Sequence, residues 1–239
     1  MDIDATLRQI NGKLKALFFA RYPNGHLSEE IDVPDYDATV ERLKKVKGRL
    51  AAHYRLTKQR NTVSAMLARI DDEMDQAEAA IASGKILMAF DTERTFAGLT
   101  KEVGVSLYQS GTVTSFNYRI EGITHNVGFS FGETIVVSNE GLVDILTQHV
   151  KSATFLLGHS LVSDFKHLRS TGVVLPHRPF FDTYWWAERF RDRLPEIGNR
   201  SLSALCGEFG VMASRPHSGG NDARYTLELI LAMLKARGI

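Results

Sequence analysis

The side chains best suited to chemistry are two acids at the end of an apolar run. Asp91 and Glu93 follow residues 86–90, ILMAF, which have the composition of a buried strand. Because side chains alternate along a strand, the two carboxylates leave it on the same face. Carboxylates held together repel each other unless a cation lies between them, and hard oxygen ligands suit Mg²⁺ or Mn²⁺. By itself, the pair is equally consistent with a structural turn.

Three further candidates lie close to expected helix starts. Asp164 follows the run TFLLG, residues 154–158, at a place where an aspartate commonly pairs with a helix dipole. Asp222 lies in the opening turn of the last expected helix, with Asn221 as a candidate cap. His217 precedes Asp222 across a Ser-Gly-Gly linker that we expect to be flexible. Taken singly, an inert loop histidine and two helix-terminal aspartates are the simpler interpretations.

A sheet is needed to bring these residues together, and the second part of the chain has the pattern of one. Short β-like runs come first and then alternate with helical runs. This order predicts an α/β fold, a mixed five-stranded sheet flanked by helices, over residues 83–239. The expected strands begin near residues 85, 102, 112, 154 and 180.

Residues 1–82 show helical periodicity only, and we expect them to form an N-terminal helical extension, either a helical hairpin or a coiled coil. Apolar residues recur every three or four positions over residues 7–18 and 40–54, and the stripe resumes over 63–81. The second half is one long helix, or two helices with a break near residues 57–61. Its stripe must pack on the first helix, on the second domain or on another copy, so a homodimer or a protein partner is expected there.

Basic residues are concentrated on the expected long helix. Residues 41–69 contain nine lysines or arginines and one acid, Glu41. Over the whole chain, 29 basic and 28 acidic residues leave a formal charge of +1, so only this local run argues for nucleic acid. A solvated helix face and a surface that contacts backbone phosphates are both open interpretations.

The remaining composition leads us to expect a soluble protein of the cytoplasm. A hydrophobic fraction of 44% is enough for a core. The single cysteine, Cys206, excludes a disulfide framework and a cysteine-based zinc site within one chain. The first ten residues carry acids where a secretory signal carries bases, and no run approaches the length of a membrane span.

The acids and the histidine are more specific in combination than singly. An Asp-x-Glu pair at the end of the first strand, a helical aspartate, and a histidine five positions before a final aspartate follow one another within residues 85–235. In this the sequence resembles the DEDDh group of DnaQ-like 3′–5′ exonucleases, which have an RNase H-like fold. Residues 117–134, 158–168 and 181–183 are similar to a branch best known from fungi, which includes an exonuclease partner of RNA silencing.

The resemblance implies hydrolysis of phosphodiester bonds with two metal ions, Mg²⁺ or Mn²⁺, as cofactors. Asp91, Glu93 and Asp222 would hold the first ion. Asp91 would bridge to the second ion, which Asp164 would support through water. His217 would remove a proton from the attacking water, a task that suits an imidazole with a reference pKa of about 6.5.

The same resemblance implies contacts to the 3′ end of a nucleic acid. Thr95 would meet the terminal 3′-hydroxyl, and Phe96 or Leu99 would wedge against the last base. Packing inside the protein explains either apolar residue equally well. His159 and Ser160 are expected to contact the substrate. Many DnaQ-like proteins have asparagine in place of Ser160, a departure that bears on contacts to the nucleic-acid backbone rather than on the metal site.

We therefore expect a metal-dependent 3′–5′ exonuclease that acts on single-stranded or frayed DNA or RNA. The alternative is a nucleic-acid-binding or protein-adaptor module with the same fold and weak or no activity. The full set of four carboxylates and a histidine favours the enzyme.

Overall fold

A computed structural model describes residues 3–21, 35–95, 98–123, 127–173, 179–191 and 200–238 of the chain. Contacts divide the chain into two units, Met1–Met66 and Leu67–Ile239. Among the described helices, none is both long and apolar enough to cross a membrane. Residues 67–82, which the sequence analysis assigned to the extension, group with the second unit. The start of the nuclease domain at residue 83 stays a prediction.

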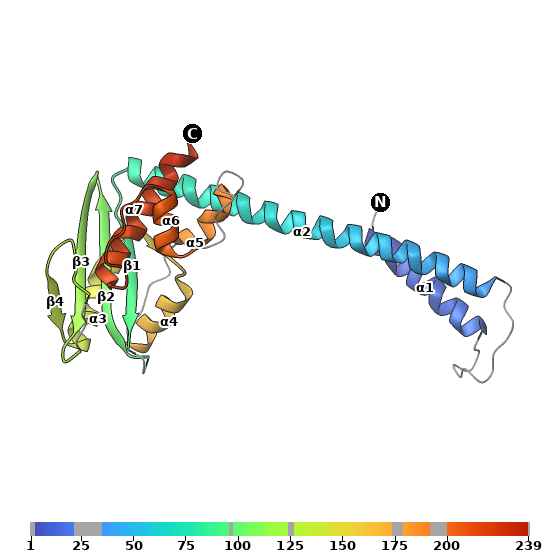
Figure 1. Ribbon diagram of the computed structural model, residues 1–239, viewed down its shortest axis with the longest axis horizontal. Coiled ribbons are helices and arrows are strands. Elements are labelled where there is room, and N and C mark those ends of the chain that lie inside the picture. Colours follow the sequence, from blue (N-terminus) through green and yellow to red (C-terminus); the bar gives the residue numbers. More distant parts are fainter. Residues whose placement is uncertain are drawn as a thin grey trace. The chain divides into compact units, whose positions relative to one another are not determined.

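The first unit contains α1 (Ile3–Arg21) and the first part of α2 (Tyr36–Ala82). Because α2 runs without a break, the alternative of one long helix is confirmed (Figure 1). The expectation that the apolar stripe of the first half of α2 resumes in its second half stays a prediction.

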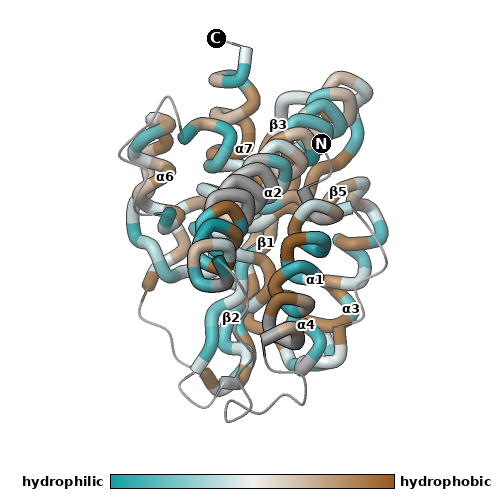
Figure 2. The backbone as a smooth tube through the Cα atoms, turned by 90° about the vertical axis from the view of Figure 1, so that its right-hand side faces the viewer, coloured by the Kyte–Doolittle hydropathy of each residue, from teal (hydrophilic) through white to brown (hydrophobic). Residues whose placement is uncertain are grey.

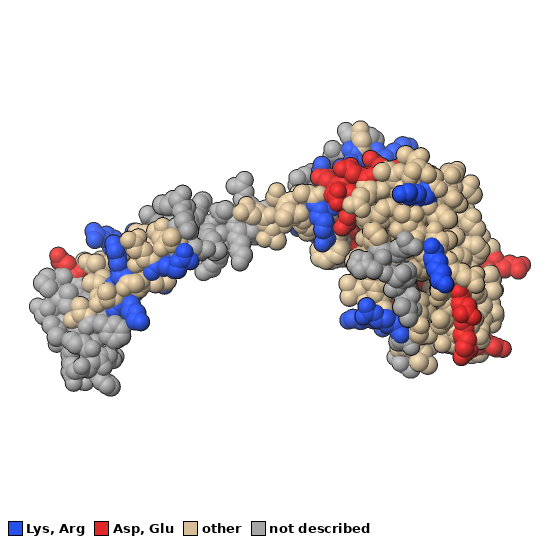
Figure 3. Space-filling view, turned by 180° about the vertical axis from the view of Figure 1, so that it is seen from behind, with Lys and Arg blue, Asp and Glu red and all other residues tan. Residues whose placement is uncertain are grey.

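The C-terminal part of α2 is a core element of the second unit. The side chains of its residues Ile70, Met74 and Ala77 are fully buried. Glu73 accepts a hydrogen bond of 2.9 Å from the indole of Trp186. Ion pairs join other acids of this segment to arginines of the second unit, where acidic and basic side chains adjoin in Figure 3. Residues 67–82 are therefore needed to complete the core of this unit.

The second unit is built on a mixed sheet with the strand order β4-β3-β2-β1-β5-β6. The pairs β1–β2 and β2–β3 are antiparallel, and the other pairs are parallel. The expected α/β class, a mixed sheet flanked by helices, is confirmed, but the expected number of five strands is wrong. The strands are β1 (Leu87–Arg94), β2 (Thr100–Gln109), β3 (Thr112–Ile120), β4 (Thr134–Val137), β5 (Phe155–Gly158) and β6 (Phe180–Asp182).

The additional strand, β4, lies at one edge of the sheet and has only four residues. Its two central side chains, Ile135 and Val136, are both exposed. A strand this short, with neither an alternating nor a buried pattern, gives little periodic signal in the sequence.

A tight turn sets the register between β2 and β3. Ser110 and Gly111 connect the paired residues Gln109 and Thr112. Both turn residues have positive φ angles, 50° and 84°, which is the backbone conformation of a two-residue type I′ hairpin. The turn thereby determines which side chains of the two strands lie opposite each other.

Helices cover both faces of the sheet. One face carries the main apolar cluster, which joins Met88 and Phe90 of β1 to Leu142 and Leu146 of α3 and Leu168 of α4. On the other face, α7 packs against β1, β2 and β3 (Figure 1). The hydropathy of these elements can be followed in Figure 2. The helices are α3 (Asn139–Ser152), α4 (Val162–Ser170), α5 (Thr183–Trp186), the 3₁₀ helix η1 (Ala187–Phe190), α6 (Leu202–Glu208) and α7 (Gly219–Arg237).

Candidate active site

Two neighbouring rows of the sheet form the floor of the candidate site. In the first row, Asp91 of β1 lies opposite Gly104 of β2, which in turn lies opposite Asn117 of β3. In the second row, Glu93 lies opposite Glu102. Because side chains alternate along each strand, both rows point to the face that α7 covers. The expectation that Asp91 and Glu93 share a face is confirmed.

The start of α7 lies directly on the first row. A Cβ atom on Gly104 would overlap the backbone of Gly219, and one on Gly220 would lie 2.7 Å from Cβ of Asn117. Gly219 and Gly220 form the first turn of α7 and are buried. The expectation of a flexible glycine linker is therefore wrong, because these glycines allow close packing of a helix on a sheet.

The expected helix cap also differs. The N-cap of α7 is Ser218, and Asn221 lies inside the helix. The Asn221 side chain accepts a hydrogen bond of 2.8 Å from the amide of Ser130 and donates to the carbonyls of Gly128 and Arg215. Asn221 therefore ties two loops to the helix start instead of capping it.

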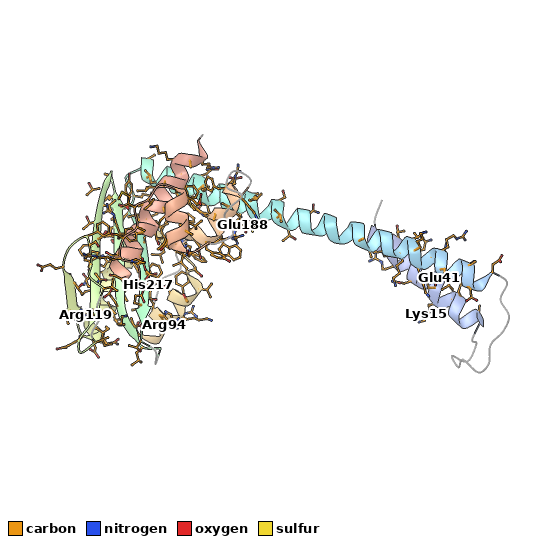
Figure 4. All side chains as sticks on the ribbon, in the orientation of Figure 1. Lys15, Glu41, Arg94, Arg119, Glu188 and His217 are labelled. Carbon is orange, nitrogen blue, oxygen red and sulfur yellow. The ribbon has the colours of Figure 1, made fainter. Side chains whose placement is uncertain are left out.

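Asp222 and His217 face the acid pair of β1. One candidate ligand atom from each of Glu93, His217 and Asp222 lies within 4.8 Å of the others. The backbone amide of His217 donates to Oδ2 of Asp222 at 2.9 Å. His217 has a φ angle of 67°, a left-handed conformation in which histidine is among the enriched residues. Its side chain is exposed at the beginning of α7 (Figure 4).

Asp164 reaches the site from α4 because β5 is short. β5 pairs with β1 only as far as Ala89, so the edge of β1 beyond that residue has no strand partner. Oδ1 of Asp164 accepts hydrogen bonds from the amide of Thr92 at 3.0 Å and from its hydroxyl at 2.6 Å. The same hydroxyl lies 2.9 Å from Nδ1 of His167. Asp164 thus occupies the free edge of β1 next to Asp91.

The site concentrates negative charge in a buried place. Burial raises the pKa of Asp91 well above its usual value of 3.8, and the charges of Asp164, Asp222 and Glu93 raise it further. Burial is also the largest cause that raises the pKa of Asp164 and of Asp222 to about 6. A divalent cation relieves such repulsion, and carboxylate oxygens are the donors that Mg²⁺ and Mn²⁺ prefer. The donor set therefore fits the expected cofactor.

All five residues proposed for the metal site and the general base come together, whereas the expected substrate contacts differ among themselves. Leu99 lies in the loop between β1 and β2 and is 65% exposed. The Thr95 hydroxyl accepts a hydrogen bond from the Leu99 amide at 3.2 Å, inside the loop itself. Phe96 lies outside the described residues.

His159 and Ser160 form a corner between β5 and α4. Nδ1 of His159 lies 2.8 Å from the hydroxyl of Thr183, and burial lowers the pKa of this histidine. Ser160 is exposed and has a φ angle of 60°. Asp182 holds the corner by accepting the amide hydrogens of Ser160 and Leu161 at 2.8 and 3.0 Å. Of these two expected substrate contacts, Ser160 is exposed and His159 is half-buried.

A fifth carboxylate at the site, Glu102, was missed in the sequence analysis. It is 1% exposed and adds to the charges that raise the pKa of Asp91 and of Asp222. The only signal in the sequence is an acid at the start of the strand run EVGVSL. That signal gains meaning only from the register that places Glu102 opposite Glu93.

Comparison with known proteins finds a family model and a curated relative to which this chain is similar. Residues 117–233 match DEDDh_C, described as "DNA polymerase III subunit epsilon-like, C-terminal domain". The uncharacterized nucleolar protein C2C4.08 of Schizosaccharomyces pombe is 25% identical over 148 residues, which cover 55% of this chain and 61% of that protein. The chain thus spans less than two thirds of the length of this relative.

Two solved structures are similar at lower identity. The protease and nuclease domain of Pan2 from Neurospora crassa is 19% identical with a TM-score of 0.42, over 64% of this chain and 28% of that chain. The RNase domain of yeast Pop2 is 10% identical with a TM-score of 0.38, over 71% and 84% of the two chains. The family match covers Asp164, His217 and Asp222, so this part of the chain is similar to the DEDDh family.

Proposed function

We propose that this protein is a metal-dependent 3′–5′ exonuclease that hydrolyses phosphodiester bonds at the 3′ ends of single-stranded or frayed DNA or RNA. The observation that carries the proposal is the convergence of four carboxylates and one histidine from three separate segments. Asp91 and Glu93 come from β1, Asp164 from α4, and His217 and Asp222 from the start of α7.

The four carboxylates are the groups that would hold two divalent ions, Mg²⁺ or Mn²⁺. Divalent metals are the general cofactors of the DEDDh family. Bound ions would supply Lewis-acid stabilisation of the charge that develops on the scissile phosphate. Asp91 is surrounded by the other acids, which supports a central role for it in holding the ions.

His217 is the proposed general base. Its imidazole lies close to the carboxylates of Glu93 and Asp222, on the exposed side of the site. From there it can take a proton from a water molecule that attacks the phosphorus atom. The hydrogen bond from the His217 amide to Asp222 holds the backbone of the base next to a metal ligand.

Preference for a 3′ end is assigned to the loop that follows the acid pair. Leu99 exposes an apolar side chain there and is the proposed wedge against the terminal base. Thr95 and Phe96 complete the proposed contact to the last nucleotide. His159 supports the adjacent corner through Thr183, and Ser160 is the proposed contact to the backbone of the substrate.

The N-terminal helices are a proposed site of association with another copy of the chain or with a protein partner. Their basic run is a second candidate surface for nucleic acid. Lys45 is exposed and Lys47 is half-buried on α2, whereas Lys44 is paired with Glu41 at 3.0 Å. Neither association is required for the chemistry proposed at the sheet.

The direct test uses 5′-labelled single-stranded RNA and DNA with Mg²⁺, Mn²⁺ or EDTA. The proposal expects a ladder that shortens from the 3′ end, depends on metal and disappears in Asp91→Ala. The polymer that is degraded faster then shows whether the enzyme prefers ribose or deoxyribose. Retained binding without degradation of either polymer would reject the enzyme and favour the adaptor module.

A further inference from the structure

The first turn of α7 is buried but is not capped by its own side chain. The first amides of an α-helix have no partner within the helix, so a buried helix start needs acceptors from elsewhere. Ser218 is the N-cap, yet its side chain makes no capping hydrogen bond. Its hydroxyl instead donates to Oε1 of Glu102 at 3.0 Å.

The acceptors come from the sheet. The amide of Gly219 donates to Oε1 of Glu102 at 2.8 Å, and the amide of Gly220 donates to Oδ1 of Asn117 at 2.9 Å. Glu102 and Asn117 are 1% and 0% exposed. A carboxylate at this position is also favoured by the positive end of the helix dipole. Side chains from two neighbouring strands, β2 and β3, therefore accept the hydrogen bonds of the first amides of α7.

The same turn carries two residues of the proposed active site. The amide of Asp222 donates to the carbonyl of Ser218 at 2.9 Å, and the carboxylate of Asp222 accepts the amide of His217. The position of the Ser218–Gly220 turn thus determines where Asp222 and His217 lie relative to the acids of β1. Gly219 also approaches the backbone of Asp91 closely, which brings the start of α7 near the acids of β1.

We propose that Glu102 and Asn117 are positioning residues that hold the first turn of α7 on the sheet and thereby set the geometry of Asp222 and His217. This inference rests on the proposed nuclease function. Neither residue is assigned contact with substrate. Glu102 acts as a hydrogen-bond acceptor, because one of its oxygens already receives two donors from the helix start.

The central experiment compares Glu102→Ala with Glu102→Gln in the full-length protein. Glutamine keeps the acceptor oxygen and loses the charge, whereas alanine loses both. Loss of a residue that orients metal ligands typically costs about 10- to 100-fold in metal affinity or activity. We expect such a decrease in kcat for Glu102→Ala, with KM for a labelled oligonucleotide and the kcat of Glu102→Gln each within about threefold of wild type.

Asn117→Ala provides an independent variant should Glu102→Ala fail to fold, and we expect it to lower kcat in the same range. The matched control is Ser115→Ala on the same strand. Ser115 is hydrogen-bonded to Ser106 of β2 at 2.8 Å, so the control removes a cross-strand hydrogen bond that does not involve α7. Equal losses of kcat in Ser115→Ala and Asn117→Ala would overturn the proposal, because they would indicate a general loss of stability.

Two readouts do not require nuclease activity. Hydrogen exchange of the Gly219 and Gly220 amides is expected to accelerate in the alanine variants, and Mn²⁺ affinity is expected to fall about 10- to 100-fold. An inactive wild type would reject the proposed function while these readouts still test the positioning. Unchanged hydrogen exchange and Mn²⁺ affinity in both alanine variants would overturn the positioning role. Equal losses of kcat in Glu102→Gln and Glu102→Ala would also overturn this role, since they would make the charge of Glu102 the essential feature.

Discussion

At the scale of single residues, the acids of the site are held so closely that folding raises their affinity for protons. The pKa of Asp222 rises from 3.8 to about 6, with burial as the largest cause. A carboxyl whose pKa is higher in the folded state than in the unfolded state contributes stability below pH 4, and this contribution is lost as the pH rises through about 6. Divalent ions oppose this effect, because they favour the charged form.

We therefore expect Asp222→Asn to stabilise the metal-free protein at neutral pH. In EDTA at pH 7, the variant should exceed wild type in free energy of unfolding by at most about 3 kcal/mol, and the difference should vanish near pH 4. Comparison with wild type isolates this carboxyl from half-buried histidines such as His149 and His159, whose lowered pKa has the opposite pH dependence. Thermal unfolding over this pH range measures the effect, and a variant that is less stable than wild type at pH 7 would contradict it.

The exposed imidazole of His217 leads to a prediction about turnover. His217→Ala removes the proposed base but leaves the four carboxylates in place, so we expect kcat to fall about 10²- to 10⁴-fold. Affinity for Mn²⁺ and for a labelled oligonucleotide should remain close to wild type. Single-turnover kinetics measure the fall in kcat, and equilibrium binding measures the two affinities. Undiminished turnover would reject His217 as the general base.

Ser160 holds a backbone conformation that suits other residues better. Its φ of 60° lies in the left-handed region, where asparagine is favoured over serine. Ser160→Asn should therefore raise the stability by about 0.5 kcal/mol, or roughly 1–2 °C in Tm. Ser203→Asn, at an exposed serine within α6, is the matched control and should bring no such gain. Equal shifts in both variants would exclude backbone conformation as the cause.

At the scale of secondary-structure elements, the site depends on how closely α7 approaches β2. Gly104 of β2 and Gly219 of α7 meet backbone to backbone, with no room for a side chain on either residue. This contact brings the first turn of a helix within reach of acceptors on a sheet. The chemistry proposed for Asp222 therefore depends on glycines that have no functional group.

Gly104→Ala should separate α7 from the sheet. Its Cβ would overlap the backbone of Gly219, and overpacking of this kind costs about 1–3 kcal/mol or more. Gly207→Ala on α6 is the matched control, because its Cβ would have no neighbour within 4 Å and alanine favours a helix by up to about 1 kcal/mol. Chemical denaturation should show opposite signs for the two variants, and a neutral Gly104→Ala would mean that the approach is looser than described.

At the scale of the whole molecule, α2 belongs to both units and limits where the chain can be shortened. Ile70, Met74 and Ala77 are fully buried in the second unit. Truncation of a buried Ile or Met to alanine alone costs about 2–5 kcal/mol, and a whole domain is stable by about 5–15 kcal/mol. A cut at residue 80 would remove all three side chains together.

We expect residues 67–239 to fold and residues 81–239 not to fold, as measured by cooperative thermal unfolding. A folded 81–239 fragment would contradict the core role of α2.

The 67–239 fragment also separates the roles proposed for the first unit. If it loses self-association but keeps activity, the helices are an assembly device. If it loses affinity and the salt dependence of binding flattens, the basic run contacts phosphates.

The amino-acid sequence by itself determined the class of fold and the five residues proposed for the metal site and the base. Strand and helix periodicity are local, so β1 to β3, α3 and the helical character of α2 follow from short windows. Whether α2 is one helix or two was left open by the sequence and was decided by the structure. The acids and His217 were found because their residue types and their order along the chain match a known chemistry. β4 was not predicted, because an exposed edge strand of four residues has no comparable pattern of apolar residues.

Only the tertiary structure decided which residues support the site. Glu102 and Ser218 are 116 positions apart, and Asn117 and Gly220 are 103 positions apart. The sequence alone therefore suggested a mobile glycine linker where the structure has the buried first turn of a helix. Register, close backbone approach and capping from another element arise when distant segments pack together, and short-range periodicity contains no information about which segments will meet.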